Sequence, residues 1–253
     1  MESPFRLDGK NILITGASSG IGKQCAIECS KEGANIILIG RNTERLKQTM
    51  DEMEGKTHLF YSLDITDFEN IEPMVSDAVN QLGKIHGFIH SAGIETTLPL
   101  KVLKPVNYQE LFNVNVIAGF EFARIITKKK YINETGASLL FIASITGIIG
   151  RVGLIAYSAT KGALISAVKS MALELASKNI RVNSISPGTV MTEMMKKYLE
   201  TLNDEQRNKR LDNIPLGIGA PKDVAHGCIY LLSDAAKWVT GTNLIVDGGY
   251  CAK

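Results

Sequence analysis

A strong net charge is absent from this sequence of 253 residues, in which 28 Lys and Arg balance 26 Asp and Glu for a formal net charge of +2. Aromatic residues make up only 6% and do not alternate with basic ones, so the pattern of a nucleic-acid-binding protein is missing. No apolar run approaches membrane-spanning length, and residues 1–11 lack the basic flank and apolar core of a secretion signal. We therefore expect a cytoplasmic protein that binds a small molecule, with no nucleic acid and no membrane among its partners.

Cysteine is also scarce. Of the four cysteines, Cys25 and Cys29 lie one helical turn apart, whereas Cys228 and Cys251 are distant and show no paired ligand spacing. A metal or redox centre is the less favoured alternative to small buried or half-buried thiols. We predict no metal site.

What the sequence does contain is one repeated pattern: a short apolar, β-branched run, a turn with Gly, Asn or Asp, and a longer segment of helical period. We predict strands over 11–16, 35–40, 58–64, 86–92, 137–144, 180–186 and 243–249. We predict helical segments over 21–32, 43–54, 67–82, 107–130, 155–178 and 222–233. Apolar strands joined by helical crossovers imply a mostly parallel seven-stranded sheet with helices on both faces. The prediction is a single doubly wound (Rossmann) α/β domain over residues 1–253.

Residues 187–221 interrupt this pattern. The segment begins with PGTV and ends with the Pro/Gly-rich stretch IPLGIGAP. Because a long insertion in a compact domain usually serves function, we predict that it forms a substrate lid.

A glycine-rich turn, TGASSGIG at residues 15–22, joins the first strand to the first helix. In a doubly wound sheet such a turn presents backbone N–H groups and the positive end of a helix to a pyrophosphate. Its glycine spacing is neither G-x-G-x-x-G nor that of a P-loop. Taken alone, the turn is therefore compatible with a phosphate cradle and with a purely steric corner.

Three side chains farther along bear on this choice. Ser144 ends the fifth predicted strand, and Tyr157 and Lys161 are four residues apart on the following helix, so both project from one helix face. The carboxyl ends of parallel strands face the crevice at which the glycine turn also points. We expect these side chains to meet the ligand of the turn.

The motifs resemble those of the short-chain dehydrogenase/reductase family, and most of all the bacterial 3-oxoacyl-(acyl carrier protein) reductases. The similar motifs occur in family order over essentially the whole chain: T-G-x-x-x-G-x-G at 15–22, Ala92-Gly93, Asn115 in NVNV, Ser144, Y-x-x-x-K at 157–161, PG at 187–188 and DGG at 247–249.

This resemblance implies hydride transfer between a nicotinamide and a ketone or secondary alcohol. The implied catalytic residues are Asn115, Ser144, Tyr157 and Lys161. Ser144 and Tyr157 hold the substrate oxygen, with Tyr157 as acid or base, and Lys161 lowers the pKa of the Tyr157 phenol and binds the nicotinamide ribose. Asn115 anchors a water that leads protons to the lysine, although a structural asparagine is the alternative.

The resemblance also implies a set of residues that contact the cofactor. These are Gly16, Ser18, Ser19, Gly20, Ile21, Gly22, Arg41, Asp64, Ile65, Ala92, Gly93, Tyr157, Lys161, Pro187, Gly188, Val190 and Thr192. At the end of the second strand, Arg41 stands where NAD enzymes place an acid, and a guanidinium suits the 2′-phosphate of NADP(H). For Arg41 the alternative is a solvated side chain with no ligand. The resemblance implies that Asp64 contacts the adenine of the cofactor, and the alternative is that Asp64 caps a helix beginning near Thr66.

Two positions depart from the family pattern. His90 and Ser91 stand where the family commonly has two asparagines, and we interpret His90 as a core histidine. Glu95 follows the same turn, as either a substrate contact or a wet loop residue.

A 3-oxoacyl thioester is the favoured substrate, with another ketone or alcohol, such as a sugar, steroid or secondary metabolite, as the alternative. Cations predicted at helix ends flanking the site are candidates for binding an acyl carrier protein or are merely solvated: Lys128, Lys129, Lys130 and Lys178. Arg151 either meets an anionic substrate group or lies in an exposed loop.

Two questions remain open: the oligomeric state of the protein and whether it is an enzyme. The helix at 162–176 is apolar nearly all round, which favours a homotetramer or a homodimer. A non-catalytic NADPH-binding protein on the same fold is the hypothesis from another class, but the presence of both Tyr157 and Lys161 argues against it.

Overall fold

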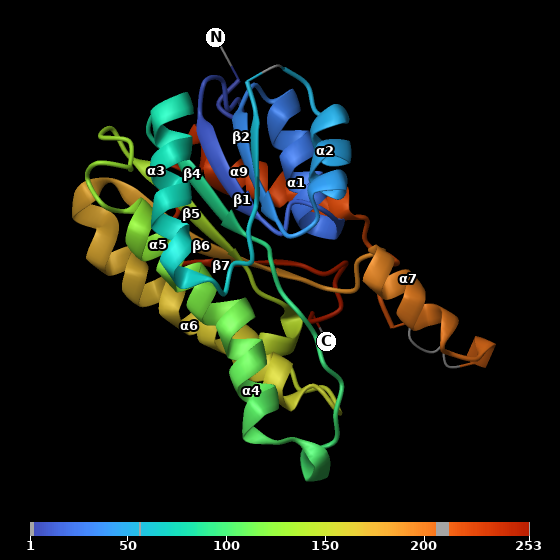
Figure 1. The fold of residues 1–253 in the computed structure, drawn as a ribbon. Helices are drawn as coiled ribbons and strands as arrows, with labels where there is room; N and C mark the ends of the chain where they lie inside the picture. The colour runs from blue at the N-terminus through green and yellow to red at the C-terminus, as the bar shows by residue number, and fades with distance from the viewer. Residues whose placement is uncertain (1–2, 56, 206–212, 253) are drawn as a thin grey trace.

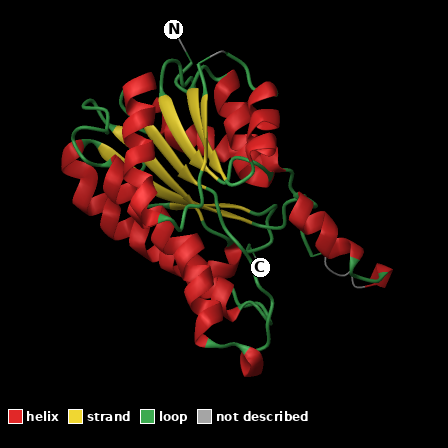
Figure 2. Cartoon of the chain, in the orientation of Figure 1, coloured by secondary structure: helices red, strands yellow, loops and turns green. Residues whose placement is uncertain are grey.

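One parallel sheet in the order β3-β2-β1-β4-β5-β6-β7 forms the centre of the computed structural model, which describes residues 3–55, 57–205 and 213–252 (Figures 1 and 2). Its strands are β1 Asn11–Thr15, β2 Asn35–Gly40, β3 Leu59–Ser62, β4 Gly87–His90, β5 Ala137–Ile142, β6 Ile180–Pro187 and β7 Asn243–Val246. Every described strand pair is parallel. The predicted doubly wound fold is confirmed.

Helices cover both faces of the sheet (Figure 2). They are α1 Gly20–Lys31, α2 Thr43–Asp51, α3 Ile71–Leu82, α4 Pro105–Phe112, α5 Ala118–Ile126, α6 Ile155–Leu175, α7 Glu193–Glu200 and α9 Pro221–Leu232. Successive residues of β1 point to opposite faces, because Ile12 and Ile14 pack in one apolar cluster with α1, α2 and α9, whereas Leu13 packs in the other with α3, α5 and α6. Two cores, one on each face, therefore hold the sheet rigid.

The segment predicted as one helix over 107–130 is built differently. It starts earlier, as α4, passes through a π-helical turn at Asn113–Ile117, and continues as α5 to Ile126. A π-helical turn inserts an extra residue into the ladder of hydrogen bonds and occurs often at functional sites. A hydrophobic period does not reveal such a turn.

The predicted lid contains a short helix that the sequence interpretation missed. Thr192 caps the N-terminus of α7, its hydroxyl accepting a hydrogen bond from the Met195 N–H at 3.2 Å. Figure 1 shows α7 extending away from the body of the molecule. Part of the predicted lid, residues 206–212, lies outside the described residues.

The strand order reverses between β1 and β4. The chain leaves β1 toward α1 on one face and leaves β4 toward α4 and α5 on the other, so the two outgoing segments separate at the paired residues Thr15 and His90. In a doubly wound sheet, this point at the carboxyl edge opens the ligand crevice.

Two further expectations concern the whole chain. None of the described helices is both long and apolar enough to cross a membrane. Cys25, Cys29 and Cys228 are buried and Cys251 is half-buried, all as free thiols. Cys25 and Cys228 join α1 to α9, with their sulfurs 3.6 Å apart.

Candidate active site

A cavity of about 950 Å³ lies at the carboxyl edge of the sheet. Its wall contains most of the predicted site: Gly16, Ser18, Ser19, Gly20, Ile21, Arg41, Asp64, Ile65, Ala92, Gly93, Ser144, Tyr157, Lys161, Pro187, Gly188, Val190 and Thr192. Gly22 and Asn115 stand behind this wall. The structure therefore brings residues from seven segments of the chain to one cavity, which is large enough for a cofactor and a substrate.

The glycine turn is shaped by close backbone approaches. Gly16 has φ +70°, and a Cβ built there would lie 2.7 Å from the Ala92 backbone nitrogen. Gly22 packs directly on the Gly16 carbonyl, so a side chain at either position would push the turn apart. The N-terminus of α1 opens into the cavity at Ser19 and Gly20, and no side chain caps it. These backbone donors fit a pyrophosphate.

Ser144 and Tyr157 form the centre of the site. Ser144 follows β5 and caps a short 3₁₀ turn at Ile145–Gly147, its hydroxyl oxygen accepting hydrogen bonds from the Thr146 N–H at 3.2 Å and hydroxyl at 3.0 Å. Tyr157 lies in the first turn of α6, close enough to Ser144 for the serine hydroxyl to lower the pKa of the phenol. The two hydroxyls thus converge on one point of the cavity wall.

Lys161 lies one helical turn beyond Tyr157 and is almost fully buried. Its ammonium donates a hydrogen bond to the Ile142 carbonyl at 2.8 Å and lies 5.5 Å from the centroid of the Tyr157 ring. Burial lowers the pKa of Lys161 to about 8, although the charge of Glu95 opposes this shift. The lysine is held close to the tyrosine, as its helical spacing predicted.

The pKa of Tyr157 differs from the expectation. Burial raises this pKa above its ordinary value, the negative charge of Glu95 raises it further, and only the hydrogen bond with Ser144 lowers it. The expected lowering by Lys161 is absent because desolvation of the phenol dominates. A tyrosine in this state is protonated at neutral pH and is a weaker acid than a free tyrosine.

Asn115 lies in the π-helical turn and is fully buried. Its side chain accepts a hydrogen bond from the Ile94 N–H at 2.8 Å and donates to the Ile94 carbonyl at 3.0 Å and to the Thr160 hydroxyl at 3.1 Å. It therefore ties the segment after β4 to α6 beside Lys161. These contacts hold the segment after β4 in place, which agrees with the structural alternative for Asn115.

The end of β2 places a cation in the cavity wall. Ser62 fixes the backbone of Arg41 by donating a hydrogen bond to its carbonyl at 3.0 Å. Asp64 accepts hydrogen bonds from the Thr66 N–H at 2.9 Å and hydroxyl at 2.7 Å, which lower its pKa, and the charge of Arg41 lowers it further. Asp64 thus closes a turn with Thr66 and does not cap a helix, because the next helical segment, the 3₁₀ turn Phe68–Asn70, has Asp67 as its N-cap.

The wall at Pro187–Thr192 depends on the last strand. The Gly188 N–H donates a hydrogen bond to the Val246 carbonyl at 2.9 Å, and a Cβ at Gly188 would lie 2.7 Å from the Asp247 Cα. Only glycine allows this approach of the two segments. The PG and DGG motifs are therefore in contact, although 59 residues separate Gly188 from Asp247.

His90, which stands where the family commonly has an asparagine, contacts the neighbouring strand β1 through its ring. Its Nδ1 lies 3.0 Å from the Thr15 hydroxyl, and Gly119 leaves room for the ring, since a Cβ there would lie 2.6 Å from it. His90 is buried, and its Nε2 has no partner among the described residues. Its interpretation as a core histidine agrees with these contacts.

Burial, aided by the charge of Lys161, lowers the pKa of His90 to about 3, which predicts a pH-dependent stability. The pKa of an unfolded histidine is about 6.5, so between these values the unfolded chain binds the extra proton and stability falls as pH falls. Between pH 6.5 and 5 this group should lower the free energy of unfolding by about 2 kcal/mol. Urea unfolding of wild type and His90→Asn at pH 7 and pH 5 measures the difference, and equal losses in both proteins would refute it.

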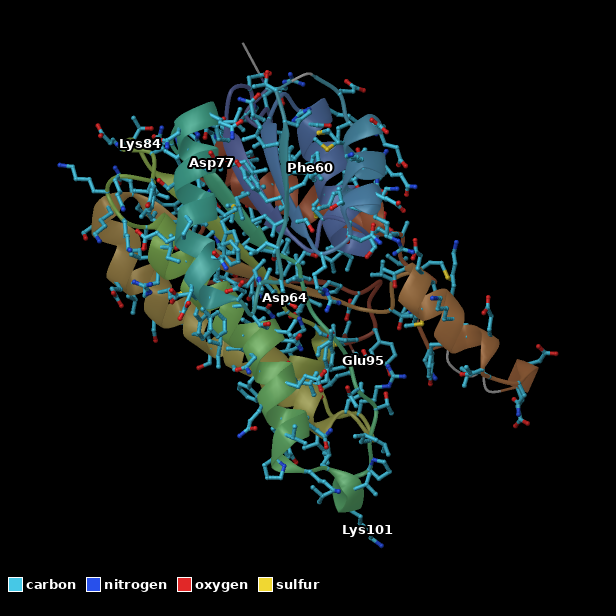
Figure 3. All side chains as sticks on the ribbon, in the orientation of Figure 1. Phe60, Asp64, Asp77, Lys84, Glu95 and Lys101 are labelled. Atoms are coloured by element: carbon cyan, nitrogen blue, oxygen red, sulfur yellow. The ribbon has the colours of Figure 1, made fainter. Side chains whose placement is uncertain are left out.

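The lysines considered for carrier-protein binding lie at the wrong end of the sheet. Lys128 and Lys130 pair with Glu72, and Lys129 and Lys178 flank a small pocket beside the starts of β5 and β6. In Figure 3, Lys84 lies beyond the amino ends of the strands, whereas Asp64 and Glu95 lie beyond the carboxyl ends. The helices run antiparallel to the strands, so their C-termini lie opposite the site, and the prediction that these lysines flank it was wrong.

The sequence interpretation missed several side chains that line the cavity. These are Ile94, Ile149, Tyr198, Leu202, Asn213 and Tyr250. A helix signal was present for α7, since Thr192 is a favoured N-cap, Glu193 suits the first turn and Lys197 the last. No local pattern indicates which of these side chains faces the cavity.

Comparison with known proteins identifies the family. The sequence model described as Enoyl-(Acyl carrier protein) reductase matches residues 16–251. The chain is 35% identical to the 3-oxoacyl-(acyl carrier protein) reductase FabG of Thermotoga maritima, covering 97% of this chain and 99% of that protein. It is 31% identical to the 7α-hydroxysteroid dehydrogenase of Escherichia coli K12, covering 97% and 95%.

Solved structures agree. A 7α-hydroxysteroid dehydrogenase complexed with NADH and 7-oxo glycochenodeoxycholic acid superposes with a TM-score of 0.91 at 30% identity over 98% of both chains. A dehydrogenase/reductase from Sinorhizobium meliloti gives 0.90 at 29%, covering 98% of this chain and 97% of that one. Fold, site and relatives together define an oxidoreductase of the doubly wound α/β class. The chain belongs to the short-chain dehydrogenase/reductase family.

Proposed function

We propose that this protein is an NADP(H)-dependent oxidoreductase that reduces a ketone to a secondary alcohol. The convergence of Ser144, Tyr157 and Lys161 on one wall of the cavity carries the proposal. When bound, the nicotinamide supplies the hydride. The glycine turn and the N-terminus of α1 fit the pyrophosphate of such a cofactor, because both offer backbone donors without a covering side chain.

The protein's own residues manage the charge that develops on the substrate oxygen. Ser144 donates a hydrogen bond to this oxygen, and Tyr157 donates a second one and then the proton. Tyr157 carries its proton at neutral pH. Lys161 places a positive charge behind the phenol as it becomes a phenolate. Asn115 holds the segment after β4 against α6 and so keeps this geometry fixed.

Arg41 supports the choice of NADP(H) over NAD(H). Arg41 lines the cavity at the end of β2 and forms no ion pair with any of the described residues. A relative of known structure is complexed with NADH, so NAD(H) is the competing cofactor. A cation suits the 2′-phosphate, which only NADP(H) carries.

Arg41→Ala is expected to lower kcat/KM for NADPH by roughly 10- to 100-fold and to leave that for NADH nearly unchanged, because a charge-assisted hydrogen bond contributes about 1.5–3 kcal/mol. Steady-state kinetics with both cofactors measure this ratio. Arg45→Ala is the matched control, since Arg45 lies on α2 and pairs with Glu193 at 3.2 Å. An unchanged NADPH/NADH ratio in Arg41→Ala would exclude the assignment.

A 3-oxoacyl thioester is the proposed substrate, supported by the 35% identity to the Thermotoga maritima reductase. The hydroxysteroid dehydrogenase at 31% identity makes an oxosteroid the second candidate. The test is NADPH consumption with acetoacetyl-CoA and, separately, with 7-oxo glycochenodeoxycholic acid. Turnover of the thioester supports the first candidate, whereas turnover of the steroid alone supports the second.

The remaining expectations are proposals as well. Leu173 on α6 and Trp238 are 84% and 96% exposed, which supports a homotetramer or homodimer because large exposed apolar side chains favour association. Several residues between Pro187 and Asn213 line the cavity, which supports a substrate lid there. Binding of an acyl carrier protein needs cations other than those at the amino edge. A cytoplasmic location stays a prediction of the sequence.

A further inference from the structure

Arg151 occupies the loop between Ser144 and Tyr157 and lines the same cavity as these two residues. It follows the 3₁₀ turn that Ser144 caps and precedes α6. The loop therefore places an exposed positive charge in the cavity wall, on a segment joined at both ends to proposed catalytic residues.

Backbone contacts hold this loop in place. The Leu98 N–H donates a hydrogen bond to the Gly153 carbonyl at 2.9 Å, which joins the loop to the segment after β4. The Leu154 N–H donates to the Arg151 carbonyl at 3.2 Å and closes a turn. Gly153, at φ +82°, packs against Thr97, because a Cβ there would lie 2.9 Å from the threonine methyl. The backbone of Arg151 is thus fixed relative to Tyr157.

No acidic partner neutralises Arg151 within the described part of the chain. Over residues 3–55, 57–205 and 213–252 it forms no ion pair and donates no hydrogen bond, and its only close partner is the ring of Tyr198 on α7, 6.0 Å from the guanidinium carbon to the ring centroid. An aromatic ring holds a guanidinium in place while leaving its N–H donors unused. These donors are arranged for bidentate contact with an anion.

Glu95 is an acidic residue of the same cavity, but it forms no ion pair with Arg151. Its charge and that of Arg151 act on each other, yet no ion pair joins them. Burial raises the pKa of Glu95 more than the charges of Arg151 and Lys161 lower it. Figure 3 shows Glu95 on the segment that follows β4, beyond the carboxyl ends of the strands. The Glu95 carboxyl group thus lines the same cavity as Arg151 and leaves the guanidinium N–H groups available to a ligand.

Apolar side chains line the same cavity. Ile94, Ile149 and Leu202 all belong to its wall, together with Arg151. A chain of methylene groups suits such a surface, and an anion at its end suits the guanidinium.

We propose that Arg151 selects ketones that carry an anionic group, a carboxylate or a phosphate, at the end of an aliphatic segment. The inference rests on the proposed ketone reduction. In this arrangement the carbonyl oxygen lies between Ser144 and Tyr157, the methylene groups lie against the apolar wall, and the anion receives two parallel hydrogen bonds from the guanidinium. Arg151 is a specificity residue, and the proton and hydride come from elsewhere in the site.

The test compares each oxo acid with its methyl ester, from 3-oxobutanoate to 6-oxoheptanoate. Wild type is expected to favour the acid at one chain length, and Arg151→Gln to lower that acid/ester ratio of kcat/KM at least tenfold, about 1.4 kcal/mol. Arg151→Lys should lower this ratio less than Arg151→Gln does, since lysine keeps the positive charge but cannot make the bidentate contact of a guanidinium. Lys129→Gln, which removes a cation at the opposite edge, should keep the wild-type ratio.

A second pair of substrates separates the two anions. Acetoacetyl-CoA carries phosphates, whereas acetoacetyl-N-acetylcysteamine carries none. If Arg151→Gln lowers only the ratio between these thioesters, the group recognised is a phosphate. If Arg151→Gln and wild type have the same acid/ester ratio and the same ratio between the two thioesters, and both still reduce the esters, the proposed role of Arg151 is wrong. The proposed ketone reduction is not affected by that result. Absence of turnover with every ketone, while NADPH binds, overturns the proposed function itself.

Discussion

Replacing Tyr157 with phenylalanine is expected to lower kcat for ketone reduction by at least about 1,000-fold, because general acid catalysis contributes roughly 10²- to 10⁴-fold and one oxygen ligand is lost with it. The phenyl ring keeps its place in α6, so the cavity should retain its shape. Binding of NADPH should therefore change by less than about threefold. Stopped-flow NADPH consumption measures the chemistry, and fluorescence titration measures the binding.

Tyr230→Phe is the matched control for this substitution. Tyr230 lies on α9 and packs against Phe5, with the ring centroids 6.3 Å apart, far in the fold from the cavity wall. Its turnover should equal that of wild type. If Tyr157→Phe keeps more than a tenth of wild-type kcat, another group supplies the proton. If it loses NADPH binding as well, the phenol acts through the structure of the site and the proposed role is wrong.

Gly16→Ala should both destabilise the protein and weaken cofactor binding. The methyl group would lie 2.7 Å from the Ala92 backbone nitrogen and 2.8 Å from its Cα, and φ at Gly16 is +70°. Backbone strain and overpacking together should lower the free energy of unfolding by about 3 kcal/mol. The turn that precedes α1 must shift to relieve the contact, so the affinity for NADPH should fall at least tenfold. Urea unfolding and cofactor titration measure the two effects.

Gly9→Ala is the control that separates the effect of backbone strain at positive φ from the effect of the steric clash with Ala92. Gly9 has φ +68°, nearly the value at Gly16, but a Cβ there meets no atom within 4 Å. It should lose only about 1 kcal/mol through backbone strain and bind NADPH as wild type does. Equal losses of stability in the two variants would show that the approach of Gly16 to Ala92 is unimportant.

Local sequence was enough to predict the scaffold and the centre of the site. The apolar strands and their helical crossovers follow from periodicity, and Tyr157 and Lys161 share a helix face because they are four residues apart. Ser144 and the turn at Gly16 follow from the rule that strand ends in a parallel sheet meet at one edge. Such predictions need only the order of elements along the chain.

What the sequence did not predict depends on contacts between distant segments. The π-helical turn at Asn115 is fixed by bonds to Ile94 and Thr160, neither of which is near it in sequence. The pKa of Tyr157 depends on how deeply α6 is buried and on Glu95 from another loop. The positions of Lys129 and Lys178 follow from helix direction, a three-dimensional fact that was available from the parallel topology but was not applied.

The contact of Gly188 with Asp247 has a consequence for biosynthesis. Residues 187–190 form one wall of the cavity, and β7 supports them through the pairing of Pro187 with Val246 and the bond to the Gly188 N–H. A nascent chain that has not yet released Val246 from the ribosome lacks this support, even when β1 to β6 have emerged. The first segment of the site, the glycine turn at Gly16, is thus made more than two hundred residues before the strand that completes the opposite wall. The wall at residues 187–190 is therefore complete only after β7 has been synthesised and has paired with β6.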